Sequence, residues 1–435
     1  MRCASSTPVR VSSSCTKTST PKTASCSKPS GTKPTPPATG HGGGSVFEPS
    51  KPAPTPVPAP PARPSVPSAS EAVRAQAVST MDALLNPQIE RKQGYNGAVV
   101  VQDAAPVQKS DNANPKSSRY KAAQAQVQQH QALEQQQLAQ LSPQERSRYE
   151  TVKQELVAAN NPVATLALQK LLVSGRLEKG SDFLDQGSVL QHLSDIAQGH
   201  DIDARVDRRT LLTDLVQELA TPSAINQGSR GTCAPTALTI GVNIERPAEY
   251  ARLIKAAAST SGDVTLANGT VLPREKDTAF EDDRSGRALT QRLLAPIFME
   301  ASNGSRDYQD SASKDKRNAG ASASGVDALY DAVYNHDMGY DSNNKDRAKL
   351  MARIRSELAE GQSVLTGITY RDGGHKLLVT GLEKRQGQEY VKYINPWGQE
   401  ERMAVAEFQS RVNNVNYDTR PAKALLQERR VFLAA

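Results

Sequence analysis

Apolar residues are spread unevenly along the 435 positions of the chain. In residues 1–67, apolar residues do not recur at a regular spacing. From about residue 117, leucine and valine recur every three to four positions, which is the spacing of one face of a helix. Beyond residue 362, short apolar runs separated by glycine-containing turns predict antiparallel strands. The pattern therefore predicts a part without a core, then a helical part, then a part rich in strands.

The first 115 residues are expected to lack a packed core. Residues 1–47 contain no Asp or Glu, six Lys or Arg and many Ser and Thr, a composition typical of disordered segments. Nine prolines between Glu48 and Pro67 fix φ and remove backbone donors, which favours an extended spacer. Residues 68–115 hold several turn signals and are interpreted as a linker with one short helix near residues 81–85.

The charge balance bears on partners and location. The chain has a formal net charge of +7, and the tail contributes six of these charges, so a folded basic face is not expected and nucleic acid is not a predicted partner. No run of about 18 apolar residues and no apolar signal-peptide core are present. We therefore expect a soluble protein with no membrane span, and both a cytoplasmic location and export by a non-Sec route stay open.

Residues 116–221 are predicted to form a small α-helical accessory or pro-domain of four to five short helices. Its best-specified helix has Ser142 as N-cap, Pro143 at the first helical position and Glu145 completing a capping box. His192 is interpreted as a surface or cap residue, because no Cys or carboxylate stands at metal-ligand spacing beside it. A pro-segment, a substrate-docking domain and a packing partner are all compatible with this pattern.

Cys233 is the only cysteine beyond residue 26, and it lies in the stretch "NQGSRGTCAPTAL". Pro235 is tolerated in a helix only in the first turn, so the helix is predicted to start at Cys233. At a helix N-terminus the macrodipole lowers the pKa of a thiol and favours the nucleophilic thiolate. The alternative is a small buried cysteine that fills space beneath a glycine-containing turn.

A predicted hairpin couples a histidine to an asparagine. If residues 385–387 form a three-residue loop, Asn395 lies opposite Leu377 and becomes a diagonal neighbour of His375 on the same face. The amide oxygen of Asn395 is then close enough to meet an imidazole N–H after modest adjustment. Trp397 follows two residues later and is expected to cover this hydrogen bond.

These motifs, in this order, resemble the papain-like cysteine peptidase superfamily. "GHKLLVTGLEK" followed by "YINPWGQEE" resembles the calpain catalytic core. "CAPTAL" departs from papain and calpain, which usually place Trp after the Cys, and is closer to the Cys-Gly-Pro pattern of bacterial leader-processing peptidases. The resemblance implies an α+β fold for residues 222–435, with a helical subdomain that carries the Cys and an antiparallel sheet that carries the His and Asn.

The resemblance also implies roles for individual residues. Cys233 would be the nucleophile, His375 the base and acid, and Asn395 the residue that orients His375. Gln227 and the backbone N–H of Cys233 would form the oxyanion hole, and Trp397 would support the site.

A protein or peptide is the implied substrate, and neither a metal nor another cofactor is expected. The calcium dependence of calpains is not carried over, because the acidic residues of the middle region do not match a calcium-loop spacing. These residues are Asp282, Asp283, Asp307 and Asp310.

Three classes of function stay open from the sequence. The first is a thiol protease, a hydrolase that acts through a Cys-His-Asn triad and a thioester. The second uses the same triad for another acyl transfer, such as peptidoglycan amide hydrolysis or transglutamination, including as a secreted bacterial effector or toxin. The third is a non-catalytic binding module whose helical region makes the contacts.

Overall fold

The computed structural model describes residues 68–95, 97–104, 111–304, 306–310, 320–342, 345–371 and 373–420. The disordered tail and the proline-rich spacer predicted for residues 1–67 lie outside these ranges. All described residues belong to one structural unit, which spans residues 65–435.

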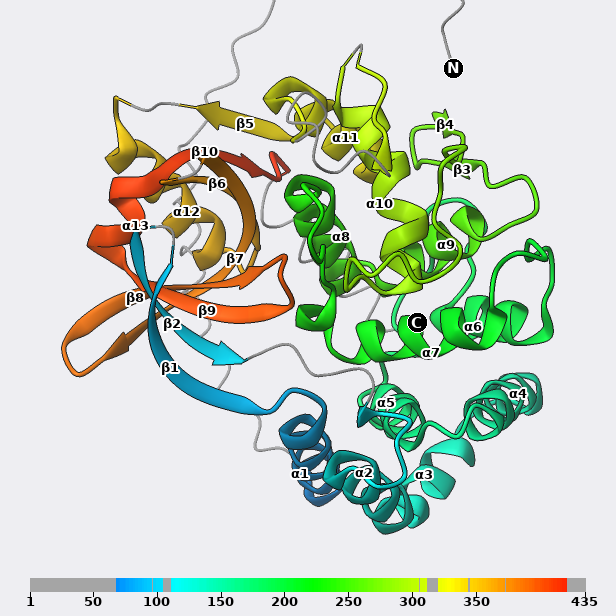
Figure 1. The fold of residues 1–435 in the computed structure, drawn as a ribbon. Helices are drawn as coiled ribbons and strands as arrows, with labels where there is room; N and C mark the ends of the chain where they lie inside the picture. The colour runs from blue at the N-terminus through cyan, green and yellow to red at the C-terminus, as the bar shows by residue number, and fades with distance from the viewer. Residues whose placement is uncertain are drawn as a thin grey trace, which may run out of the picture. The chain divides into compact units, whose positions relative to one another are not determined.

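Helices dominate the first half of this unit, and most strands follow in the second half (Figure 1). The helices are α1 (Ala69–Leu85), α2 (Ser118–Gln129), α3 (Gln131–Leu138), α4 (Pro143–Ala158), α5 (Pro162–Val173), α6 (Val189–Gln198), α7 (Arg208–Ala220), α8 (Cys233–Glu245), α9 (Pro247–Ala257), α10 (Leu289–Ser302), α11 (Ala323–Tyr334), α12 (Arg347–Ala359) and α13 (Val405–Arg411). The strands are β1 (Gln88–Tyr95), β2 (Ala98–Ala104), β3 (Val264–Thr265), β4 (Val271–Leu272), β5 (Gly339–Ser342), β6 (Val364–Tyr370), β7 (Gly373–Arg385), β8 (Gln388–Asn395), β9 (Gln399–Ala404) and β10 (Val412–Tyr417).

The main sheet has the strand order β1-β2-β9-β8-β7-β6-β10-β5, and every neighbouring pair is antiparallel. Strands β3 and β4 form a separate short hairpin. The predicted α+β class with an antiparallel sheet is confirmed.

Each face of the main sheet packs against helices. Side chains alternate between the two faces of a strand, so Leu377 and Val379 of β7 belong to one core while Leu378 belongs to the other. The first core is closed by α12, through residues such as Ile354. The second core is shared with α8, through residues such as Leu238. Strand β7 therefore lies beside α8, where it can present side chains to the start of that helix.

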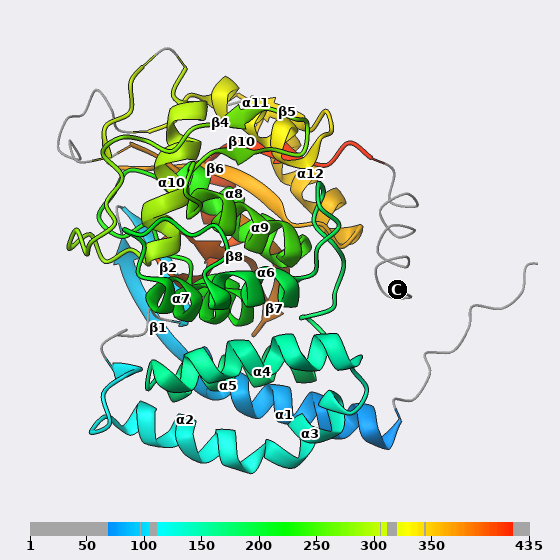
Figure 2. The ribbon, with the colours of Figure 1, turned by 90° about the vertical axis from the view of Figure 1, so that its right-hand side faces the viewer.

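The helical region surrounds α5, which is buried along almost its whole length. Helices α1 to α5 lie together on one side of the molecule, next to α6 and α7 (Figure 2). The capping box of α4 is present, with Ser142 as N-cap, Pro143 at the first position and Glu145 bonded back, as predicted. One continuous apolar core runs from α5 to α8, while the boundary near residue 221 stays an interpretation.

The linker predicted for residues 68–115 is wrong over most of its length. Ser68 and Glu71 form a capping box that starts α1, a signal that is present in the sequence as "SASE". Strands β1 and β2 then form a hairpin, and β2 pairs with β9, with Val101 opposite Arg402. Val100 is fully buried. The hairpin was not predicted because β1 is polar and largely exposed, so that it shows little apolar alternation.

Two smaller expectations also need correction. The apolar runs beyond residue 362 that predict strands include "ERMAVAEF", but the strand there ends at Ala404 and the chain continues as the short helix α13. His192 is not a surface residue. It is buried, and its Nε2 lies 2.8 Å from Asp182 Oδ2. Asp182 lies ten residues earlier in a loop, and helical periodicity does not predict the position of a loop residue.

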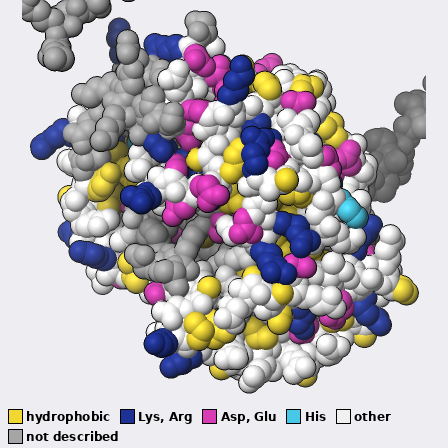
Figure 3. All heavy atoms as spheres, turned by 45° about the vertical axis from the view of Figure 1, so that its right-hand side comes forward, with side chains coloured by type: hydrophobic (Ala, Val, Ile, Leu, Met, Phe, Trp, Pro, Cys, Tyr) yellow, Lys and Arg dark blue, Asp and Glu magenta, His cyan; other side chains and the backbone are white. Residues whose placement is uncertain are grey.

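Basic and acidic side chains are interspersed on the face drawn in Figure 3. Among the helices that the structure describes, none is both long and apolar enough to cross a membrane.

Candidate active site

Cys233 is the first residue of α8, and its side chain is partly exposed. The preceding N-cap, Thr232, makes no side-chain capping bond, so the first backbone N–H groups of the helix are not capped by this residue. Cys233 lines a cleft of about 520 Å³. The thiol thus lies at a helix N-terminus and at a surface that a ligand can reach.

The imidazole of His375, near the start of β7, lies against this thiol. Burial acts to raise the pKa of Cys233, but a hydrogen bond and charge from His375, together with the backbone N–H groups of Lys376 and Ala234, outweigh it and lower the pKa. Burial acts to lower the pKa of His375, but its interaction with Cys233 and its bond to Asn395 raise the pKa overall. Both directions favour a thiolate–imidazolium pair.

Asn395, the last residue of β8, holds the other side of the imidazole. The Nε2 of His375 and the Oδ1 of Asn395 are 3.0 Å apart, and the Asn395 amide is fully buried. Its Nδ2 donates to Glu401 Oε2 at 3.1 Å. Because a carboxylate accepts, this bond turns the amide oxygen toward His375, so Nε2 carries the proton and Nδ1 is left for the thiol.

The hairpin reaches this geometry by a route that differs from the prediction. Its loop has two residues, Gln386 and Gly387, both with positive φ (49° and 81°), so Arg385 pairs with Gln388. An irregularity between Val379 and Gly381 then shifts the register by one residue. The two departures cancel, and His375 and Asn395 meet as expected.

Trp397 stacks on His375, with ring centroids 4.2 Å apart and ring planes 12° apart. The ring of Tyr370 also stacks on His375, at 5.6 Å. Tyr95, from the unpredicted β1 strand, contacts Trp397 at 4.9 Å. These rings fix the plane of the imidazole and shield its bond to Asn395 from water.

Gln227 lies beside the loop that follows Asn395, because its backbone N–H donates to the Pro396 carbonyl at 2.7 Å. Its side-chain Nε2 donates to the Arg230 carbonyl at 2.6 Å, within the loop that leads to Cys233. The structure therefore brings Gln227 next to the Asn395 turn, and its role as an oxyanion donor stays a prediction.

Glu401 is a site residue that the sequence reasoning missed, although a signal existed. Gly398 has a φ of 72° and closes a three-residue loop, so Asn395 pairs with Gln399. The same register places Glu401 opposite Tyr393, one diagonal step from Asn395 on the same face. Lys376 was also missed, because nothing in the pattern of β7 marks it as a cleft residue.

The residues that line the cleft come from α8, α11, β6, β7 and β10, and from the segments that follow α10 and precede α11. None belongs to the fully described range 116–221. The structure therefore favours a packing partner over a segment that covers the cleft as the role of that range. The lining residues are Cys233, Ala234, Asn303, Arg306, Gly320, Ala321, Ser322, Ala323, Val326, Gly367, Gly374, His375, Lys376, Asn413 and Asn414.

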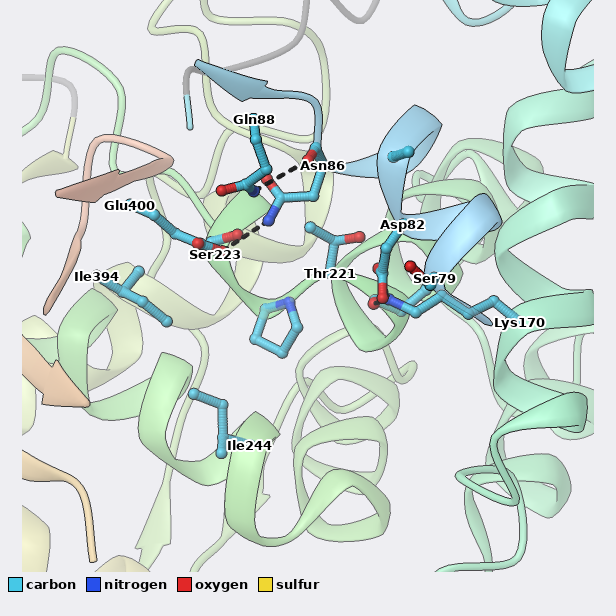
Figure 4. Close-up of a pocket in the computed structure, with 13 residues that line it drawn as sticks. Ser79, Asp82, Asn86, Gln88, Lys170, Thr221, Ser223, Ile244, Ile394 and Glu400 are labelled. Atoms are coloured by element: carbon cyan, nitrogen blue, oxygen red, sulfur yellow. Dashed lines mark hydrogen bonds and ion pairs between the residues drawn. The ribbon is translucent and has the colours of Figure 1, made fainter. Parts of the chain in front are cut away.

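A second cavity, of about 540 Å³, lies between α1, α5 and the end of the sheet (Figure 4). Lys170 pairs with Asp82 on one side, and Asn86 Nδ2 donates to Glu400 Oε1 at 2.7 Å on the other. Neither Cys233 nor His375 lines this cavity.

Within the described ranges, one acidic group has a spacing that suits a metal ion. Glu275, Glu300 and Asp307 place oxygen atoms within 4.8 Å of one another. Asp307 is one of the four acidic residues named from the sequence, and none of the three residues lines the cleft that contains Cys233.

Comparison of the chain with models of protein families, with curated proteins and with solved structures gives no significant match. The function of the protein is therefore inferred from the geometry of its site.

Proposed function

We propose that the protein is a cysteine peptidase of the papain-like type, which hydrolyses peptide bonds through Cys233, His375 and Asn395. One observation carries the proposal. A partly exposed thiol at a helix N-terminus contacts an imidazole whose opposite nitrogen is held by a buried amide. The position of the thiol on α8 and of the other two residues on an antiparallel sheet agrees with the two-part arrangement that the sequence resemblance implies.

The reaction follows from these contacts. The thiolate of Cys233 attacks the substrate carbonyl carbon, and the carbonyl oxygen takes up negative charge that the Cys233 backbone N–H can stabilise. The imidazolium of His375 gives its proton to the leaving amine, and a thioester remains. His375, now neutral, removes a proton from water, the hydroxide attacks the thioester, and the thiol is released with the proton.

Digestion of a mixed protein substrate, read by mass spectrometry, tests the proposal. Wild-type protein should release peptides that the Cys233→Ala variant does not release, and a Cys26→Ala variant should behave as wild type. Parallel assays with cell-wall amides and with glutamine plus an amine cover the other acyl transfers. Activity confined to those assays would replace the peptidase by one of them, and inactivity of wild type in all assays would leave only a binding module.

A further inference from the structure

Lys376 directly follows His375, and its side chain lines the same cleft as Cys233. The residue is only 8% exposed. Its backbone N–H is one of the groups that lower the pKa of the Cys233 thiol. A lysine so close to the thiol, buried and yet part of the cleft wall, calls for a physical explanation, because lysine is rarely buried unless its charge is paired.

The ammonium of Lys376 is held by amide oxygens. Its Nζ donates to Asn414 Oδ1 at 2.5 Å and to Asn416 Oδ1 at 2.6 Å. An ammonium has three N–H donors, and these two bonds use two of them. The Asp327 carboxylate bonds the far side of the Asn416 amide, at 2.8 Å. Burial lowers the pKa of Lys376 to about 7, which is the expected result for an ammonium whose neighbours do not neutralise it fully.

The amides around Lys376 are themselves fixed in orientation. Asn414 Nδ2 donates to Asn413 Oδ1 at 2.5 Å, and Asn413 Nδ2 donates to Thr369 Oγ1 at 2.9 Å. These bonds keep the amide oxygen of Asn414 turned toward the ammonium. The lysine is therefore held in place before any ligand arrives.

The charge of the cleft wall points to the ligand. The described lining residues include Arg306, His375 and Lys376 but no Asp or Glu. Gly367 allows the asparagines to pack closely against β6, since a Cβ there would come within 2.3 Å of Asn414 Nδ2. The described wall next to the nucleophile therefore carries basic side chains and no carboxylate, and a carboxylate is the partner that would complete the hydrogen bonding of Lys376.

We propose that this cleft selects substrates with an acidic side chain near the bond that is cleaved, and that Lys376 is the residue that determines this specificity. The inference rests on the proposed peptidase function and deepens it by naming the substrate class. A carboxylate bound by Lys376 should favour Glu over the isosteric Gln by roughly 10- to 100-fold in kcat/KM, the range expected for a hydrogen bond between charged groups.

Peptides that carry a single Glu or Gln at each of three positions on either side of the cleaved bond measure this preference. The assay is run near pH 6, where Lys376 is protonated. Wild type should prefer Glu at one position, Lys376→Met should lose the preference, and Lys376→Glu should prefer Lys there. Lys392→Met, a surface lysine outside the cleft, is the matched control and should keep the preference. Circular dichroism checks that each variant is folded.

If the Lys376 variants do not fold, the ratio of kcat/KM between the Glu and Gln peptides in wild type decides the inference. Cleavage with equal rates for Glu and Gln at every position would overturn the acidic specificity and leave the peptidase proposal standing. A Glu preference that persists in folded Lys376→Met would remove Lys376 from the role. If wild type cleaves none of the peptides in the set or in the protein digest, the proposed function fails, and the specificity fails with it.

Discussion

Glu401 offers a test of how the site maintains its ion pair, through the substitution Glu401→Gln. The variant keeps an oxygen that can accept from Asn395 Nδ2 but removes the negative charge. Hydrogen bonds of 3.0 Å and 3.1 Å on the two sides of the Asn395 amide separate Glu401 from the imidazole. At a separation of about 7 Å and an effective dielectric constant of about 20, a carboxylate and an imidazolium attract by about 2 kcal/mol.

Loss of this attraction should shift the Cys233–His375 pair toward its neutral form. The thiolate is simultaneously relieved of some repulsion by Glu401, so we expect a net fall of about tenfold in the rate at which iodoacetamide alkylates Cys233 near neutral pH. Above about pH 10 a thiol ionises without help, and the two rates should converge. Alkylation is followed by intact-mass spectrometry over a series of pH values.

Glu400→Gln is the matched control for the alkylation experiment, because Glu400 bonds Asn86 in the second cavity instead of Asn395. Equal alkylation rates for wild type and Glu401→Gln at neutral pH would refute the argument that the charge of Glu401 supports the ion pair.

The same variant has an expected effect on stability. Burial raises the pKa of Glu401, so the ionised carboxylate is disfavoured in the folded protein, and the contribution of Glu401 to stability declines as the pH rises through that pKa. The free energy of unfolding of Glu401→Gln should therefore not fall at neutral pH.

Three further predictions concern the surroundings of the site and the scaffold. Trp397→Ala removes the ring that stacks on His375 and should lower kcat up to about tenfold in a peptide-cleavage assay, and an unchanged kcat would argue against a role for the stack. Ser142→Ala should lower the free energy of unfolding in urea by about 1 kcal/mol, because it breaks the capping box with Glu145, whereas no loss would contradict the capping contribution. Burial acts to raise the pKa of Asp182, but His192 and backbone N–H groups outweigh burial and lower the pKa to about 2. The ionised Asp182 carboxylate therefore stabilises the fold above about pH 4, and this contribution is lost as the pH falls toward 2. Asp182→Asn should therefore show a weaker loss of urea stability between these pH values than wild type, and parallel curves would contradict this.

The parts of the fold that the sequence predicts best are those set by local signals. The Ser142 capping box and the start of α8 at Cys233 follow from single residues with strong positional preferences. The contact between His375 and Asn395 follows from hairpin geometry, although the loop length and the register irregularity were each missed. The pair was therefore placed correctly because the shorter loop and the irregularity shift the register in opposite directions.

The features that were missed depend on contacts between distant segments. Strand β1 is polar, and only its pairing within the sheet gives Tyr95 a place against Trp397. Lys376 would be interpreted as a solvent-facing residue of a strand, since its asparagine partners lie on β10, about 40 positions later. The spacing of apolar residues within one segment does not indicate a contact with a residue on a distant strand.

The most direct test of the central claim is intact-mass spectrometry after exposure to a peptidyl fluoromethyl ketone near neutral pH, with Cys3, Cys15 and Cys26 replaced by Ser. We predict that one equivalent becomes attached at Cys233, and that His375→Ala in the same background stays unlabelled because its thiol is not ionised. Equal labelling of both proteins, or labelling of neither, would contradict the claim that His375 activates Cys233.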